Sequence, residues 1–127
     1  MNREKTAEFM VDCLAHMPDQ QEEVQSVVDT AIAGLKRIAN GGEWPADEAW
    51  AAERAAGMAA ARTAEWAAEW AAARTAEWAA YWAAYCSAET ADRAADYAAR
   101  AHPDPDAERA RQKAKREELG LNTKQEA

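Results

Sequence analysis

The sequence predicts an all-α protein: a compact helical bundle with a long alanine- and tryptophan-rich helical region and a charged C-terminal helix or tail. Two observations predict this class. Apolar side chains in residues 4–38 recur at three- and four-residue spacing, which is the period of an amphipathic helix. Residues 46–101 contain no proline and a single glycine, so helix propensity is uninterrupted over that stretch.

The first helix is expected over residues 4–17. Phe9, Cys13, Leu14 and Met17 fall on one side of it at three- and four-residue spacing, and Pro18 stops it. The result is a short amphipathic helix.

The second helix is expected after Pro18, because Asp19 stands three residues before Glu22 in the spacing of a reciprocal N-terminal capping box. The turn "NGGEWP" ends it, since glycine adopts the left-handed conformation that terminates helices. Seven apolar residues form its expected core stripe: Val24, Val27, Val28, Ala31, Ile32, Leu35 and Ile38.

Bulky side chains recur every fourth residue in the next region, with little but alanine between them. A single helix over residues 46–101 would be roughly 84 Å long, which is too long for a small domain. We therefore expect breaks near Gly57 and near Cys86 to Ser87, giving segments 46–57, 59–86 and 88–101. Tryptophans would supply buried area and alanines close helix approach. Five residues are assigned structural roles here: Trp66, Trp70, Arg74, Trp78 and Trp82.

Arg74 lies within the aromatic arc of that region, one helical turn from Trp70 and from Trp78. An unpaired charge would be costly there, so the guanidinium needs partners. One interpretation is a structural arginine stacked between indoles and paired with a carboxylate of the first two helices. The other is an open aromatic groove in which Arg74 accepts an acidic group of a ligand. The candidate carboxylates are Glu8, Asp12 and Asp29.

Residues 1–102 are expected to form the bundle domain and residues 103–127 a separate charged segment. Positions 106–118 carry charges on most faces and no large apolar side chain, which is typical of an exposed helix or a partly disordered tail. Leu119 and Leu121 are the candidates for anchoring this segment to the body.

The formal net charge is −8 and the isoelectric point is about 4.8. Residues 103–127 hold six acidic residues and six Lys or Arg, so residues 1–102 carry the whole acidic excess. Such a surface repels nucleic acid and anionic membranes and favours a protein partner with a basic surface. The recurring acids indicate either a solvated helix face or a surface that imitates phosphate spacing: Glu53, Glu65, Glu69, Glu77, Glu89, Asp92 and Asp96.

The sequence offers no catalytic, cofactor-binding or metal-binding set. Cys13 and His16 have helical spacing, but Cys86 and His102, which would have to complete a zinc site, are sixteen residues apart. No glycine-rich phosphate loop is present. We therefore expect a non-enzymatic protein without a cofactor, and the two cysteines with no leader segment favour the cytoplasm.

The order of parts resembles a known group. A short first helix ("AEFMVDCLAHMP"), a second ending at a glycine turn ("VQSVVDTAIAGLKRIANGGEWP") and a run of alanine pairs punctuated by aromatics resemble alanine-rich proteins of phages and bacteria catalogued as immunity proteins. The resemblance covers residues 7–101. It implies a small protein that acts by binding, in a phage or mobile-element setting.

Three functions stay open. The leading hypothesis is an anti-CRISPR-like inhibitor that blocks a nucleic-acid-binding or nuclease site of a host defence complex. The alternatives are an immunity protein or antitoxin that neutralises a cognate toxin, and a helical assembly module that forms homo-oligomers. Exposed indoles concentrate binding energy, and acids suit a basic partner. The partner-contact candidates are therefore Trp44, Trp50, Glu65, Glu69 and Glu77.

Overall fold

The computed structural model describes residues 2–85 and 88–121, and every regular element within those ranges is a helix. The prediction of a compact all-α fold is confirmed. The helices are α1 (Arg3–Ala15), α2 (Glu22–Ala39), α3 (Ala46–Arg62), α4 (Ala67–Tyr85), α5 (Ala88–Arg100) and α6 (Pro105–Leu119).

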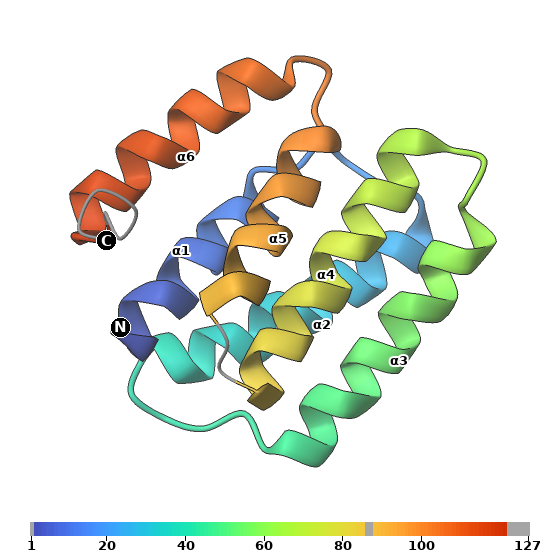
Figure 1. The fold of residues 1–127 in the computed structure, drawn as a ribbon. Coiled ribbons are helices and arrows are strands. Elements are labelled where there is room, and N and C mark those ends of the chain that lie inside the picture. Colours follow the sequence, from blue (N-terminus) through green and yellow to red (C-terminus); the bar gives the residue numbers. More distant parts are fainter. Residues whose placement is uncertain (1, 86–87, 122–127) are drawn as a thin grey trace.

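The first five helices form two layers (Figure 1). Helices α3, α4 and α5 lie side by side in one layer, and α1 and α2 pack together behind it. Helix α6 packs against α1 and α5 at the edge of the bundle away from α3. The order of the front layer places α3 and α4 next to each other as an antiparallel pair joined by a short turn.

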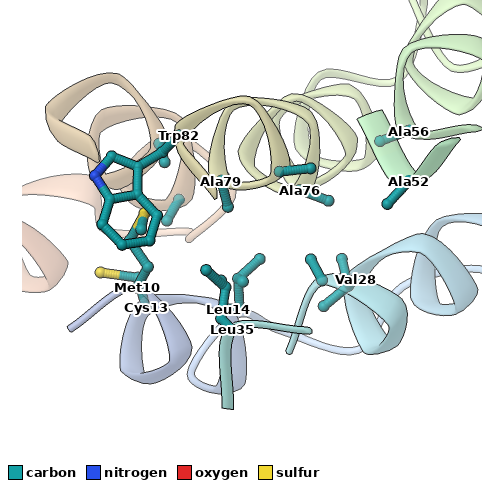
Figure 2. Packing of buried hydrophobic residues seen from close by; sticks show 14 of the residues in the cluster. Met10, Cys13, Leu14, Val28, Leu35, Ala52, Ala56, Ala76, Ala79 and Trp82 are labelled. Atoms are coloured by element: carbon teal, nitrogen blue, oxygen red, sulfur yellow. The ribbon is translucent and has the colours of Figure 1, made fainter. Parts of the chain in front are cut away.

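The two layers contribute different side chains to the core. Figure 2 shows Leu14, Val28 and Leu35 of the α1–α2 layer facing alanines of α3 and α4 across the interface. The alanine side chains leave room for these larger aliphatic groups, so the layers fit closely. Trp82 is the large ring that α4 places in this interface, and its predicted structural role in the core is confirmed.

The break predicted near Gly57 is wrong. Helix α3 runs through Gly57 to Arg62, and the chain turns at residues 63–66 instead. A glycine inside a helix costs only about 1 kcal/mol, which packing against α4 offsets. Thr63 is the C-cap of this helix, and its buried hydroxyl donates to the carbonyls of Ala59 and Ala60.

Two further boundaries differ in detail. Helix α2 begins at Glu22 behind Gln21, and no side chain caps it, so the predicted Asp19 capping box is wrong. The backbone N–H of Gln21 instead donates to a carboxylate oxygen of Glu69 on α4, at 3.1 Å. Helix α4 ends at Tyr85, and the predicted break at residues 86–87 lies outside the described residues.

Trp44 belongs to the core. It leads into α3 and is only 6% exposed, with its ring lying over Gly34 of α2. A Cβ atom at position 34 would come within 2.2 Å of that ring, so glycine is required for the close approach. The prediction of Trp44 as an exposed contact residue is wrong, because the turn after α2 folds the ring back over the helix.

The charged C-terminal segment forms a helix, α6, that docks through polar side chains. Glu108 is 5% exposed, and Arg111 donates to it while also donating to Asp12 of α1 at 2.6 Å. Gln112 donates to the carbonyl of Ala95 on α5 at 3.0 Å. The anchoring role predicted for Leu119 and Leu121 is confirmed, since both pack partly buried against the core.

Gly34→Ala should destabilise the protein by about 1–3 kcal/mol, because the added methyl group clashes with the Trp44 ring. Chemical denaturation followed by circular dichroism measures this. Gly57→Ala is the matched control: its Cβ would meet one Glu77 carboxylate oxygen at 3.1 Å, which a shift of a few tenths of an ångström relieves, and helix propensity favours alanine. Equal losses for both variants would contradict the assigned role of Gly34.

Arg111→Ala should loosen α6, because it leaves the buried Glu108 carboxylate without its arginine. Hydrogen exchange should show α6 amides losing protection at least tenfold, while those of α2 keep theirs. Arg109→Ala removes only exposed ion pairs with Asp96 and Asp106 and should cost less than about 1 kcal/mol. Unchanged α6 protection in Arg111→Ala would show that another contact holds the helix.

Candidate functional site

Four large apolar side chains of the described residues are strongly exposed. Trp50 is 44% exposed, Tyr85 50%, Met58 55% and Trp66 56%. Single exposed apolar residues are common on protein surfaces, whereas contiguous ones mark interaction sites. The relevant question is therefore which of the four belong to a larger arrangement.

Trp50 and Tyr85 belong to a continuous row of rings across α3 and α4. The ring centroids of Trp50 and Tyr85 are 5.9 Å apart, those of Tyr85 and Tyr81 4.4 Å, and those of Tyr81 and Trp78 5.4 Å. The α4 members share one face because they are spaced three and four residues apart, and the antiparallel α3 brings Trp50 beside Tyr85. We call these four residues the aromatic ladder.

A notch opens at the end of the ladder where Trp50 and Tyr85 meet. It has a volume of about 220 Å³. Gly57 lets a carboxylate approach the backbone of α3, since a Cβ there would lie 3.1 Å from a Glu77 oxygen. The residues that line the notch are Trp50, Glu53, Arg54, Gly57, Glu77 and Tyr85.

Two carboxylates in the notch are held in an unfavourable setting. Burial raises the pKa of Glu53, and the nearby negative charge of Glu77 raises it further, while Arg54 lowers it only in part. Burial also raises the pKa of Glu77, although an ion pair with Arg74 partly offsets this. Glu53 forms no ion pair or hydrogen bond with any side chain of the described residues. The notch therefore holds a carboxylate that the fold does not neutralise.

Arg74 is a structural residue. Its guanidinium carbon lies 5.8 Å from the ring centroid of Trp70, 5.7 Å from that of Trp78 and 5.3 Å from that of Tyr97 on α5. Burial alone would lower the pKa of Arg74, but its hydrogen bonds to Tyr97 and Glu77 raise it overall. The guanidinium nitrogen Nη1 donates to Glu77 at 2.5 Å.

The carboxylates that the sequence suggested for Arg74 are the wrong ones. Asp12 binds Arg111 of α6, and Asp29 accepts from Gln25, so neither reaches Arg74. Glu8 is exposed on α1. The carboxylate that pairs with Arg74 is that of Glu77, on the same helix.

The five predicted contact candidates are distributed unevenly. Trp50 and Glu77 meet in the notch, although Glu77 is half-buried. Glu65 is exposed in the turn between α3 and α4. Glu69 is half-buried at the start of α4, where it accepts a hydrogen bond from the Gln21 N–H. Glu65 and Glu69 therefore lie at the opposite end of α4 from the notch.

The predicted structural tryptophans are also divided. Trp70 and Trp78 pack partly buried against the core, as expected of structural residues. Trp66 is exposed, and the prediction of a buried structural role for it is wrong. It precedes α4 in the turn from α3, and more than half of its surface is exposed.

The acids of α5 do not form a free negative row. Arginines of α5 and α6 neutralise them, so the imitation of phosphate spacing is not supported on this helix. The pairs are Glu89 with Arg93, Asp92 with Arg116, and Asp96 with both Arg100 and Arg109.

Metal binding, thiol chemistry and membrane crossing were also considered for the described residues. They contain no group of three or more His, Cys, Asp or Glu side chains placed to hold a metal ion. Burial raises the pKa of Cys13 far above neutral pH, so this thiol stays protonated and unreactive. None of the helices described is long and apolar enough to cross a membrane.

No protein-family model, curated protein or solved structure matches this chain. The resemblance to immunity proteins therefore stays a prediction, and the candidate site rests on its own geometry.

Sequence reasoning missed that Tyr85 belongs to the aromatic ladder and that Glu53 and Glu77 line the same notch. The spacing of Trp78, Tyr81 and Tyr85 already placed three rings on one helical face. The sequence did not predict the contact between Trp50 and Tyr85. Because a break was expected at Gly57, no continuous helix was expected to run antiparallel to α4 and place Trp50 beside Tyr85.

Glu53→Gln should stabilise the protein at pH 7. The folded-state pKa of Glu53 is raised above the ordinary value of 4.5, so the folded protein binds this proton more tightly than the unfolded chain. Its contribution to stability therefore rises as the pH falls through the raised pKa and is complete below 4.5. Urea denaturation at pH 7 and pH 4.5 should show an advantage of the variant that shrinks at the lower pH. A variant less stable than wild type at pH 7 would contradict this.

Proposed function

We propose that this chain is a non-enzymatic protein-binding inhibitor, and that it docks through the aromatic ladder and its acidic notch onto a basic surface of its partner. The observation that carries the proposal is the pairing of exposed rings with an unneutralised carboxylate between α3 and α4. Exposed Trp and Tyr side chains are the residues in which protein interfaces concentrate binding energy.

The distribution of charge supports a basic partner. The chain carries a net charge of −8, which accelerates association with a positive surface and slows it with a negative one. The arginines of α5 and α6 neutralise the acids on their side of the bundle, so that side contributes little. On the α3 side, exposed Asp47 and half-buried Glu53 have no ion-pair partner among the described residues.

A basic surface large enough to hold such a protein is typical of sites that bind DNA or RNA backbones. Occupying it would exclude the nucleic acid by competition and would require no chemistry from the inhibitor. The resemblance to phage and bacterial proteins suggests the setting: an anti-CRISPR-like inhibitor in the host cytoplasm that blocks a nucleic-acid-binding or nuclease site of a defence complex.

The direct test is competition with nucleic acid. Purified CRISPR effector complexes are mixed with fluorescent target DNA, and the loss of anisotropy on adding this protein is measured at low and high salt. At least one complex should release its DNA, and the inhibition should weaken as salt rises. Unchanged DNA binding together with growth rescue against a co-encoded toxin would replace this function by that of an antitoxin. Recovery of only this chain in a host-lysate pull-down would contradict both.

Trp50→Ala should reduce inhibition at least tenfold while the helical circular dichroism spectrum stays unchanged, because Trp50 is exposed and anchors the ladder. Trp66→Ala removes an even more exposed indole, just before the other end of α4, and should inhibit as wild type does. Equal losses in the two variants would show that the ladder is not the docking surface.

A further inference from the structure

The notch combines two features that recognise the same chemical group. Its lining includes Trp50 and Tyr85, whose ring centroids are 5.9 Å apart, and two acidic residues, Glu53 and Glu77. Aromatic faces attract cations through the negative potential of their π-systems, and carboxylates accept hydrogen bonds from them. Both features therefore select a cation and repel an acidic group.

The contents of the notch restrict the kind of cation. A divalent metal ion needs several oxygen or nitrogen ligands, whereas the notch offers one free carboxylate and one already paired with Arg74. A volume of about 220 Å³ admits a side chain but not a helix. Flat aromatic walls suit a planar cation, which can stack on a ring and donate to a carboxylate at its edge at the same time.

We propose that the notch between α3 and α4 binds an arginine side chain of the partner, whose guanidinium stacks on the Trp50 ring and donates to the Glu53 carboxylate. This assignment rests on the proposed function and names the chemistry that the site recognises. The same arrangement occurs within the fold, where Arg74 stacks against Trp70 and Trp78 while donating to Glu77. The partner's arginine would make the same kind of contacts with Trp50 and Glu53 of α3.

The cost of Glu53 to the fold supports a binding role. Its charged form is disfavoured by burial and by Glu77, so the free protein would be more stable without it. Residues that lower stability without an evident structural gain are concentrated at functional sites. A bound guanidinium would neutralise Glu53 and remove its repulsion with Glu77.

Arg54 provides an internal competitor. It lines the notch, yet it forms no ion pair with either carboxylate. Its positive charge opposes the entry of a second cation, so removing it should strengthen binding of the arginine. Losing Glu53 and losing Arg54 should therefore have opposite effects at a single site.

The test uses three blocked peptides, acetyl-Gly-X-Gly-amide, in which X is arginine, lysine or the neutral isostere citrulline. The chain has six tryptophans, whose indole N–H signals can be followed by NMR, and Trp50→Phe identifies the signal of Trp50. The arginine peptide should shift that signal saturably at millimolar concentration, the lysine peptide less, and the citrulline peptide not at all. Equal shifts with citrulline, or shifts centred on Trp66, would overturn the proposal.

Charge variants make the test specific. Glu53→Gln should weaken binding of the arginine peptide about fivefold, and Arg54→Ala should tighten it about twofold. Asp19→Asn removes one exposed acidic charge in the loop between α1 and α2, near the opposite end of α4, and should bind as wild type does. Equal weakening by Glu53→Gln and Asp19→Asn would show only a net-charge effect and would overturn the proposed contact.

Failure of this inference and failure of the proposed function give different results. If the arginine peptide does not bind but Trp50→Ala still abolishes inhibition of a defence complex, the ladder is the docking surface and the notch does not take arginine. If the peptide binds as described and no complex is inhibited, the arginine site stands and the inhibitory function is wrong.

Discussion

The close approach of the helices is the constraint on which this structure depends, and alanine makes it possible. The inward faces of α3, α4 and α5 are built almost entirely of alanine, and larger aliphatic side chains from α1 and α2 fill the space against them. Helices that meet through such small side chains come near the lower limit of interhelical distance. An indole in one of those contacts would force two helices apart.

That constraint explains where the tryptophans lie. Of the rings on the described part of α4, Trp82 is the one that is fully buried, and it lies close to Met10 and Cys13 of α1 (Figure 2). Trp44 is buried only because Gly34 leaves space for it. The remaining rings pack at the margins or face solvent, where they meet arginines and one another. The aromatic ladder, which we propose as the docking surface, is thus also a consequence of the alanine core.

The sequence predicted the helical class, the first two helices, the core role of Trp82 and the aromatic surroundings of Arg74. These features depend on periodicity and spacing within a single helix, which a sequence displays directly. The misplaced features depend on tertiary contacts. Gly57 resembles a helix terminator until α4 supports it, and Trp44 appears exposed until the turn folds it onto α2. At the candidate site, Trp50 and Glu77 could be named, whereas their meeting with Glu53 and Tyr85 required the antiparallel arrangement of α3 and α4.

The distribution of lysines also determines how the molecule can be attached to a solid support. Every lysine falls outside residues 37–112, and those of the described residues belong to α1, α2 and α6. Amine-reactive coupling therefore cannot take place through a lysine of α3, α4 or α5. A sensor surface prepared in this way carries the protein without modifying any residue of the notch, so captured partners can be measured on unaltered binding groups.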